Sequence, residues 1–248
     1  MKYIGIIPAR YASTRFPGKP LVDIGGMTMI ERVYRQASKA LERIVVATDD
    51  ERIFNTVKEF GGEVVMTSTA HRSGTDRCRE AYIKAGSTAD VVVNIQGDEP
   101  FIAPSQIEAV KSCFEADPTT PIATLVRRFD PAAGIDALQN PNTPKVVLDN
   151  SDNALYFSRS VIPYIRGCAP EQWPDTTTFY THVGLYAYRA DVLEAITCLP
   201  QSPLELAESL EQLRWLQNGY RIATALTDEP TIGIDTPTDL ARALAHLN

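Results

Sequence analysis

Four basic side chains and no acidic one lie within the first 22 residues of the sequence: Lys2, Arg10, Arg15 and Lys19. The last three belong to PARYASTRFPGKP, a segment interrupted by Gly and Pro that directly follows the short apolar run YIGII. A loop that follows a strand can bring cations and backbone N–H groups together around a phosphate. The segment has neither the GxxxxGK[ST] of a Walker A loop nor the GxGxxG of a dinucleotide-binding turn. We therefore predict a phosphate-binding loop of another type, with a solvated basic loop as the alternative.

Acidic side chains follow two later apolar runs. QGDEP places Asp98 and Glu99 at the end of the strongest of these runs, and GIDTPTDL places Asp235 at the end of another. Mg²⁺ commonly takes one or two carboxylates and completes its shell with water and substrate phosphate. Asp98 and Asp235 could share such an ion. The alternative is a Gly-Asp turn at the first position and helix capping at the second, where Thr236 and Asp239 suit a cap but leave Asp235 unassigned.

Two further polar positions allow two interpretations each. In HRSGTDR, Ser73 or Thr75 can cap a helix whose first turn holds Arg77. A cation at that end opposes the helix macrodipole, which indicates either an anionic or acceptor partner for Arg77 or a solvated side chain. His182 begins the apolar segment THVGLYAYR and is either a satisfied core residue or a donor to a sugar.

The segment LELAESLEQLRWL has leucines at helical spacing, and we expect this stripe to lie in the core. The stripe consists of Leu206, Leu210, Leu213 and Leu216. The acidic residues beside it are expected on a solvated face by default. They are Glu205, Glu208 and Glu211.

These polar segments need a scaffold, and the apolar pattern predicts one. Strand-like runs alternate with helical patterns through the first half of the chain, which indicates right-handed βαβ units and a doubly wound sheet. The strands are expected in YIGII, RIVVATDD, EVVMTS and DVVVNIQGDEP, and the helices in residues 27–41, 50–60 and 74–86. Ligands of such sheets bind beyond the carboxyl ends of the strands, where the polar segments stand.

The pattern changes after a helix at 105–114 and a strand at 121–128. KVVLDNSDNALYFSR predicts a hairpin rather than a crossover, and a polar loop and the strand 181–189 follow it. Helical segments at 190–199 and 203–219, a strand at 221–226 and a closing helix complete the chain. We predict an α/β fold with a mixed, mainly parallel doubly wound sheet. Residues 1–248 form one domain, into which an antiparallel sub-lobe is inserted at about 125–190.

Composition limits the partners of this chain. The 248 residues carry a formal net charge of −7, a poor match for nucleic acid or an anionic membrane. The four cysteines have no CxxC pair and no histidine cluster around them, so free thiols are expected. No apolar stretch approaches the ~20 residues of a membrane span or forms a signal sequence, so we expect a cytoplasmic protein.

The ordered series of motifs resembles the 3-deoxy-manno-octulosonate cytidylyltransferases, the CMP-Kdo synthetases of Gram-negative bacteria. The resemblance runs nearly end to end through IIPARYASTRFPGKPL, SGTDR, VVVNIQGDEP, NPNTPKVVLD, ALYFSRSVIP, HVGLYAYR, SPLELAESLEQLRWL and GIDTPTDL. It implies a glycosyltransferase-A-like nucleotidyltransferase that uses CTP and Mg²⁺ to activate Kdo for lipopolysaccharide biosynthesis and dimerises through the inserted lobe. CMP-sialic acid and 8-amino-Kdo cytidylyltransferases are the alternatives. A nucleotide-sensing protein without turnover is another, and a nucleic-acid-binding module is disfavoured by the charge.

The resemblance also implies roles for individual residues. The catalytic set comprises Arg10, Arg15 and Lys19 on the CTP phosphates, with Asp98 and Asp235 as the Mg²⁺ ligands. The nucleotide-binding set adds the backbone at Pro8 and Ala9, which reads cytosine, and the turn residues Ser73, Gly74 and Arg77. The sugar-binding set is Gln96, Arg159, His182, Tyr186, Glu211 and Gln212. The sequence departs from the expected pattern at Thr181, where a lysine or arginine is expected, and at Thr143 and Pro144.

Overall fold

The computed structural model describes residues 1–12, 16–230, 233–234 and 236–245, which fall into two compact units. Unit 1 comprises Met1–Glu108, Leu185–Thr197 and Glu229–Asn248, and unit 2 comprises Ala109–Gly184 and Cys198–Asp228. The chain passes from one unit to the other within α4 (Pro104–Ala116) and within β8 (Tyr180–Arg189). The prediction of one domain with an inserted sub-lobe stays a prediction beside this division.

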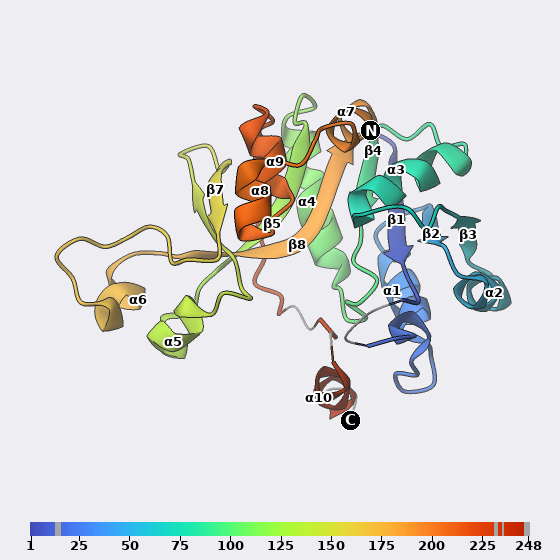
Figure 1. Ribbon diagram of the computed structural model, residues 1–248, viewed down its shortest axis with the longest axis horizontal. Helices are drawn as coiled ribbons and strands as arrows, with labels where there is room; N and C mark the ends of the chain where they lie inside the picture. Colours follow the sequence, from blue (N-terminus) through green and yellow to red (C-terminus); the bar gives the residue numbers. More distant parts are fainter. Residues whose placement is uncertain (13–15, 231–232, 235, 246–248) are drawn as a thin grey trace. The chain divides into compact units, whose positions relative to one another are not determined.

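The sheet of unit 1 has the strand order β3-β2-β1-β4-β8. Its first four strands are parallel, and Figure 1 shows β1, β2 and β3 side by side. The last strand, β8, runs antiparallel to β4, with Val93 opposite Ala187. The strand bounds are β1 (Tyr3–Ala9), β2 (Ile44–Thr48), β3 (Glu63–Met66) and β4 (Val91–Asn94). The predicted mixed, mainly parallel α/β sheet is confirmed.

Burial explains why these runs form central strands. Every residue of β2 and β4 is buried, and so are five of the seven in β1. Strands that are covered on both faces carry continuous apolar runs rather than an alternating pattern, as parallel sheets require. Their polar residues therefore collect at the carboxyl ends.

The helices of unit 1 begin where the sequence supplies a cap. Thr28 accepts the Glu31 N–H in front of α1, and Asp50 accepts the Arg52 N–H in front of α2. Thr236 and Asp239 exchange hydrogen bonds at the start of α10, the predicted capping interaction. The bounds are α1 (Met29–Ala37), α2 (Glu51–Glu59), α3 (Gly74–Lys84), α7 (Ala190–Thr197) and α10 (Pro237–Ala245).

Unit 2 joins parallel and antiparallel pairs. In the parallel pair of β5 and β9, Ile122 lies opposite Ile222. β6 and β7 form the predicted hairpin, and β6 also pairs antiparallel with β8, with Lys145 opposite Thr181. The strands are β5 (Ile122–Arg128), β6 (Lys145–Leu148), β7 (Ala154–Ser158) and β9 (Ile222–Leu226). The helices are α5 (Gly134–Gln139), α6 (Trp173–Thr176), α8 (Pro203–Glu208) and α9 (Gln212–Gln217).

One predicted helix of unit 2 is wrong. The segment 203–219 is not continuous, because Ser209 adopts a left-handed conformation with φ 52° and separates α8 from α9. Because of the break, the leucines of α8 and α9 do not share one helical face: Leu206 is 60% exposed, while Leu213 is fully buried. The predicted core stripe of leucines is therefore wrong at Leu206, since helical periodicity ends at the break.

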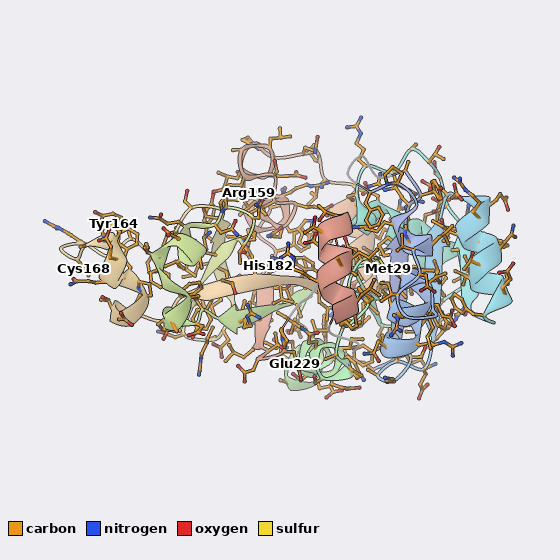
Figure 2. All side chains as sticks on the ribbon, turned by 90° about the horizontal axis from the view of Figure 1, so that it is seen from below. Met29, Arg159, Tyr164, Cys168, His182 and Glu229 are labelled. Carbon is orange, nitrogen blue, oxygen red and sulfur yellow. The ribbon has the colours of Figure 1, made fainter. Side chains whose placement is uncertain are left out.

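A smaller apolar cluster lies in unit 2. Leu138, Trp173 and Phe179 are buried together, with Phe129, Ile135, Val161, Ile165 and Cys168 against them. Figure 2 shows Tyr164 near Cys168 on the segment that carries α6, and its ring meets Trp173 edge to face at 5.0 Å.

All four cysteines are free thiols, as predicted. Among the described residues, no helix has the length and apolar character that a membrane span needs.

Candidate active site

The basic loop leaves the carboxyl end of β1 and is anchored at both of its described ends. The Gly18 N–H donates to the Tyr11 carbonyl at 3.0 Å, and the Arg52 guanidinium lies 3.2 Å from the centroid of the Tyr11 ring. Gly18 has φ +73°, which L side chains rarely adopt, and directs the chain into the short 3₁₀ turn Lys19–Leu21. Arg15 lies outside the described residues.

Lys19 meets the first predicted metal carboxylate. Its Nζ lies 2.7 Å from Asp98 Oδ2, and the two side chains are 14% and 32% exposed. The loop that carries Asp98 approaches the end of β1 closely, since a Cβ at Gly97 would come within 2.9 Å of the Pro8 carbonyl oxygen. Only glycine leaves room for this approach. The structure thus brings together a cation from the first strand end and a carboxylate from the fourth.

An apolar cluster lies behind this contact. Ile24, Met29 and Ile234 are fully buried together, and Phe16 and Phe101 pack against them. Figure 2 marks Met29. The cluster ties the segments that flank Lys19 and Asp98 to the C-terminal segment of unit 1. The Ile234 N–H also donates to the Asp98 carbonyl oxygen at 3.0 Å. Asp235, the next residue, lies outside the described residues.

The neighbour of Asp98 is a second acid, Glu99. Burial, and after it the charge of Asp98, raise the pKa of Glu99 to about 7. Asp98 and Glu99 are neighbours in QGDEP, and of these two Asp98 forms the ion pair with Lys19. Among the described residues, no group of three or more His, Cys, Asp or Glu side chains could hold a metal. A site built on one described carboxylate still fits Mg²⁺, which needs few protein ligands, and does not fit a closed zinc site.

The predicted nucleotide-side turn forms the N-terminus of α3. Ser73 caps this helix by accepting the Asp76 N–H at 3.1 Å. Gly74 lies against Pro8, where an added Cβ would stand 3.4 Å from the proline Cγ. Pro8 and Ala9 end β1, so this turn adjoins the strand end from which the basic loop departs. The free N–H groups at a helix N-terminus favour an anion.

Arg77 lies within this helix but does not reach solvent, so the solvated alternative is wrong. Its side chain is 1% exposed, with Nη2 2.6 Å from Asp49 Oδ2 and Nη1 2.6 Å from Thr67 Oγ1. Asp49 follows β2 and Thr67 follows β3, so Arg77 ties the ends of two strands to α3. The anionic partner inferred from the sequence is thus Asp49. A direct contact of Arg77 with the nucleotide stays a prediction.

Glu80 organises the segment before α3, which the sequence analysis did not identify. Its carboxylate accepts the Ser68 N–H at 2.8 Å, bonds the ring of His71 and pairs with Lys84. Burial raises the pKa of Glu80, but these hydrogen bonds outweigh it and lower the value to about 2. The exposed Arg10 reaches the same segment, with Nη1 3.5 Å from the His71 carbonyl.

Two predicted sugar-binding residues belong to unit 1. Gln96 is half-buried in the loop after β4. Tyr186 stands on β8 opposite Asn94, and its ring stacks on Tyr188 with centroids 6.0 Å apart. Gln96 thus follows β4 in the chain, and Tyr186 lies beside the end of β4 on the neighbouring strand.

Arg159 of unit 2 binds backbone. Three of its N–H groups donate to carbonyls, at 2.6 Å to Glu208, 2.8 Å to Pro141 and 3.3 Å to Ser209. The Glu208 carboxylate in turn accepts Ser158 Oγ at 2.7 Å and the Arg159 N–H at 2.8 Å. A guanidinium has five N–H groups, so two remain for other acceptors. Arg159 and Glu208 together hold the left-handed turn that separates α8 from α9.

Residues on both sides of that turn form an ionic triad around Arg214. Arg214, 8% exposed, donates to Glu205 Oε1 at 2.9 Å and to Glu211 Oε1 at 3.0 Å. Glu205 also closes a capping box with Ser202 at the start of α8. The predicted solvated face is thus wrong for Glu205, which is 6% exposed, while Glu211 keeps a partly exposed carboxylate. Gln212 is buried at the start of α9.

His182 lies on β8 in unit 2 (Figure 2), next to Thr181, which is buried. Its Nε2 lies 3.0 Å from Thr124 Oγ1, and Phe157 meets the ring edge to face at 5.1 Å. Burial lowers the pKa of His182 to about 4, so the ring is neutral at neutral pH. The fully buried Lys145 lies opposite Thr181 and donates to the carbonyls of Asn140 and Thr143.

Residues 4–222 match the family profile described as cytidylyltransferase. The class that fold and site define is thus a nucleotidyltransferase. The 3-deoxy-manno-octulosonate cytidylyltransferase of Phocaeicola vulgatus is 66% identical over 247 residues, which cover 100% of this chain and 98% of that protein. The protein of the same name from Parabacteroides distasonis is 64% identical, with coverage of 100% and 98%.

A solved structure supports the same relationship. CMP:2-keto-3-deoxy-manno-octonic acid synthetase complexed with CTP matches with a TM-score of 0.91 and 42% identity, covering 100% of this chain and 98% of that chain. The chain belongs to the 3-deoxy-manno-octulosonate cytidylyltransferase family.

Proposed function

We propose that this enzyme transfers a cytidylyl group from CTP to Kdo and releases diphosphate. The anomeric 2-hydroxyl of Kdo attacks the α-phosphorus, the bond to the bridging oxygen breaks, and CMP-Kdo and diphosphate result. The observation that carries the proposal is the contact between Lys19 and Asp98. It brings a cation suited to phosphate and a carboxylate suited to Mg²⁺ to one place.

Unit 1 supplies the nucleotide side of this reaction. Lys19, together with Arg10 and Arg15, neutralises the β- and γ-phosphates, where negative charge grows as diphosphate leaves. Fixed cations at that position stabilise the transition state without reorganising. Backbone groups at Pro8 and Ala9 read the cytosine. The turn at Ser73 and Gly74 supplies N–H groups next to them, and Arg77 holds that turn in place through Asp49.

Asp98 and Asp235 would hold Mg²⁺. The donor chemistry fits, because Asp98 offers a partly exposed carboxylate oxygen and Mg²⁺ accepts one or two such ligands. When bound, the ion lowers the pKa of a coordinated hydroxyl and compensates phosphate charge. Lys19 then exchanges part of its contact with Asp98 for a phosphate oxygen.

In unit 1 the candidates for sugar contacts are Gln96 and Tyr186, and unit 2 has its own candidates. Glu211, whose side chain is 27% exposed and pairs with Arg214, can bond sugar hydroxyls. Gln212 supplies an amide, and Arg159 can offer its two remaining N–H groups. His182 is neutral and therefore bonds a sugar hydroxyl rather than attracting the sugar carboxylate.

We also place the reaction in lipopolysaccharide biosynthesis in the cytoplasm and expect a homodimer formed through the sub-lobe. Support for the dimer comes from apolar side chains of unit 2 that remain exposed, Leu155 at 60% and Tyr164 at 73%. Light scattering after size-exclusion chromatography would measure the mass, and a single-chain mass at micromolar concentration would contradict the dimer.

Pyrophosphate release tests the function. The enzyme is incubated with CTP, Mg²⁺ and one of three acceptors, Kdo, 8-amino-Kdo or sialic acid, with UTP as the nucleotide control. We expect the highest kcat/KM for CTP with Kdo. A preference for either other sugar would replace the substrate assignment. Calorimetric CTP binding without release for any acceptor would favour a nucleotide sensor.

A further inference from the structure

Lys145 is a buried basic residue to which the proposed reaction gives no role. It begins β6, and its side chain has no exposed surface. Its Nζ donates to the carbonyls of Asn140 at 3.0 Å and Thr143 at 2.8 Å. Burial lowers the pKa of Lys145, an effect that the charge of Glu208 opposes and that of Arg159 reinforces. A polar group is stable in the interior where it is hydrogen-bonded, so the backbone in front of β6 is folded around Nζ.

Both carbonyls belong to residues 140–144, which we call the 140–144 loop. The side chain of Asn140 accepts the Asn142 N–H at 3.0 Å, and its carbonyl accepts the Thr143 N–H at 3.2 Å. The two prolines of the loop have fixed φ angles and no N–H to contribute to further backbone bonds. The side chain of Lys145 therefore joins the two sides of this turn from within the fold.

Two other carbonyls of the 140–144 loop hold residues that are candidates for sugar contacts. The Pro141 carbonyl accepts Nη1 of Arg159 at 2.8 Å. The Pro144 carbonyl accepts the backbone N–H of His182 at 2.9 Å. The loop thus supports both the guanidinium of Arg159 and the backbone of His182.

We propose that Lys145 is a positioning residue for the sugar acid, because it holds the 140–144 loop in the shape in which the Pro141 carbonyl orients the Arg159 guanidinium. The inference rests on the proposed function, in which Arg159 contacts the sugar acid. A guanidinium is a planar fork, so a rotation of the fork displaces all the N–H groups that it offers. Since Lys145 has no exposed surface, it acts through the loop and not by contact with substrate.

The support of the loop can be measured in the free protein by hydrogen exchange of the full chain. Lys145→Met keeps the apolar stem and removes Nζ. We expect the backbone amide of His182 to exchange about tenfold faster in this variant, because the Pro144 carbonyl is no longer fixed. The internal control is the amide of Thr224, which donates to the Asp152 carbonyl at 2.8 Å elsewhere in unit 2. Unchanged exchange at His182, or equal acceleration at Thr224, would overturn the inference.

Steady-state kinetics then test the link to Arg159. Lys145→Met should raise the KM for Kdo about tenfold, the effect of roughly one hydrogen bond to a charged group, and leave kcat and the KM for CTP unchanged. In an Arg159→Met background the same substitution should raise the KM for Kdo less than about twofold, because the group that it positions is gone. Equal effects in both backgrounds would show that Lys145 does not act through Arg159, and the inference would fail.

Two control variants in unit 2 separate positioning from stability. Ile222→Ala shortens a fully buried side chain on β9, so it should lower the urea midpoint of unfolding but leave the KM for Kdo unchanged. Arg221→Met removes a cation whose pair with Asp117 is largely exposed, and it should change neither KM. If Ile222→Ala raised the KM for Kdo as much as Lys145→Met, lost stability would explain both. Lys145→Gln, which keeps a side-chain N–H, replaces Lys145→Met if circular dichroism shows that the latter does not fold.

The outcomes separate this inference from the proposed function. If the wild type releases pyrophosphate from CTP with Kdo and Lys145→Met leaves the KM for Kdo unchanged, the positioning role is refuted and cytidylyl transfer stands. If no sugar acid supports release, the proposed function fails, and with it the claim of a positioned sugar contact. Hydrogen exchange then still decides whether Lys145 holds the 140–144 loop.

Discussion

Replacement of Arg77 by Met tests whether the SGTDR turn uses this arginine to bind nucleotide or to hold the fold. Methionine keeps the length and apolar stem of the side chain but removes the guanidinium. It therefore leaves Asp49, which is 13% exposed, without its partner at 2.6 Å, and Thr67 without a donor. The variant therefore loses the contacts that join the ends of β2 and β3 to the first turn of α3.

The magnitude follows from burial. Breaking a buried ion pair by removing one partner costs about 3 to 5 kcal/mol, because the other charge remains uncompensated. We therefore expect Arg77→Met to lower the free energy of unfolding in urea by this amount. Asp49→Asn in the same chain removes the stranded charge, so the double variant should recover about half of the loss.

A matched pair on the surface of the same unit provides the control. Arg43 and Glu63 are also 2.6 Å apart, but both side chains are 39% exposed, and such pairs contribute under about 1 kcal/mol. Glu63→Gln should thus change the unfolding free energy little. The reasoning would be refuted if Arg77→Met unfolded like the wild type and instead raised the KM for CTP, since Arg77 would then act on the nucleotide.

Three further predictions concern the proposed site. Lys19→Ala and Asp98→Asn should each slow pyrophosphate release by about 100-fold or more, since each removes a charge from the transition-state environment, with unchanged circular dichroism; normal turnover in either would contradict the assignment. Glu80→Gln should raise the KM for CTP several-fold by releasing the segment before α3, and an unchanged KM would show that this segment does not contact nucleotide. Because the pKa of His182 is about 4 in the fold and 6.5 unfolded, the unfolded chain takes the proton first. Stability should hold above pH 6.5 and fall by at most about 3 kcal/mol towards pH 4, a fall that His182→Asn should reduce.

The strand ends could be predicted from the sequence because a parallel sheet brings them to one edge whatever the details of packing. Lys19 and Asp98 are 79 residues apart in the chain, yet each follows a buried strand, and the structure places their side chains in contact. The helix caps could also be predicted locally, since a cap depends on residues three positions apart: Thr236 was identified, and Ser73 was one of two candidates beside Thr75.

The predicted continuous helix at 203–219 was wrong because it ends at a residue that gives no local signal in the sequence. The pattern of 203–219 continues through Ser209 at helical period, but the left-handed turn is imposed from elsewhere in unit 2 by Arg159, which binds the carbonyls of Glu208 and Ser209. Once the helix breaks, the periodicity that predicted a solvated Glu205 no longer applies. A serine gives no warning of this break, unlike a glycine or proline.

Charge pairing explains how an acidic chain can bind a triphosphate. In the free protein Lys19 and Asp98 compensate each other, so neither partly buried charge stands alone. A nucleotide without metal would take Lys19 and set phosphate against the Asp98 carboxylate, which is unfavourable. At the site we propose, a nucleotide with Mg²⁺ would bring an anion for Lys19 and a cation for Asp98, so every charge would keep a partner. The pair of Lys19 and Asp98 would therefore favour the metal-bound form of the nucleotide, and the net charge of −7 elsewhere would not enter the balance.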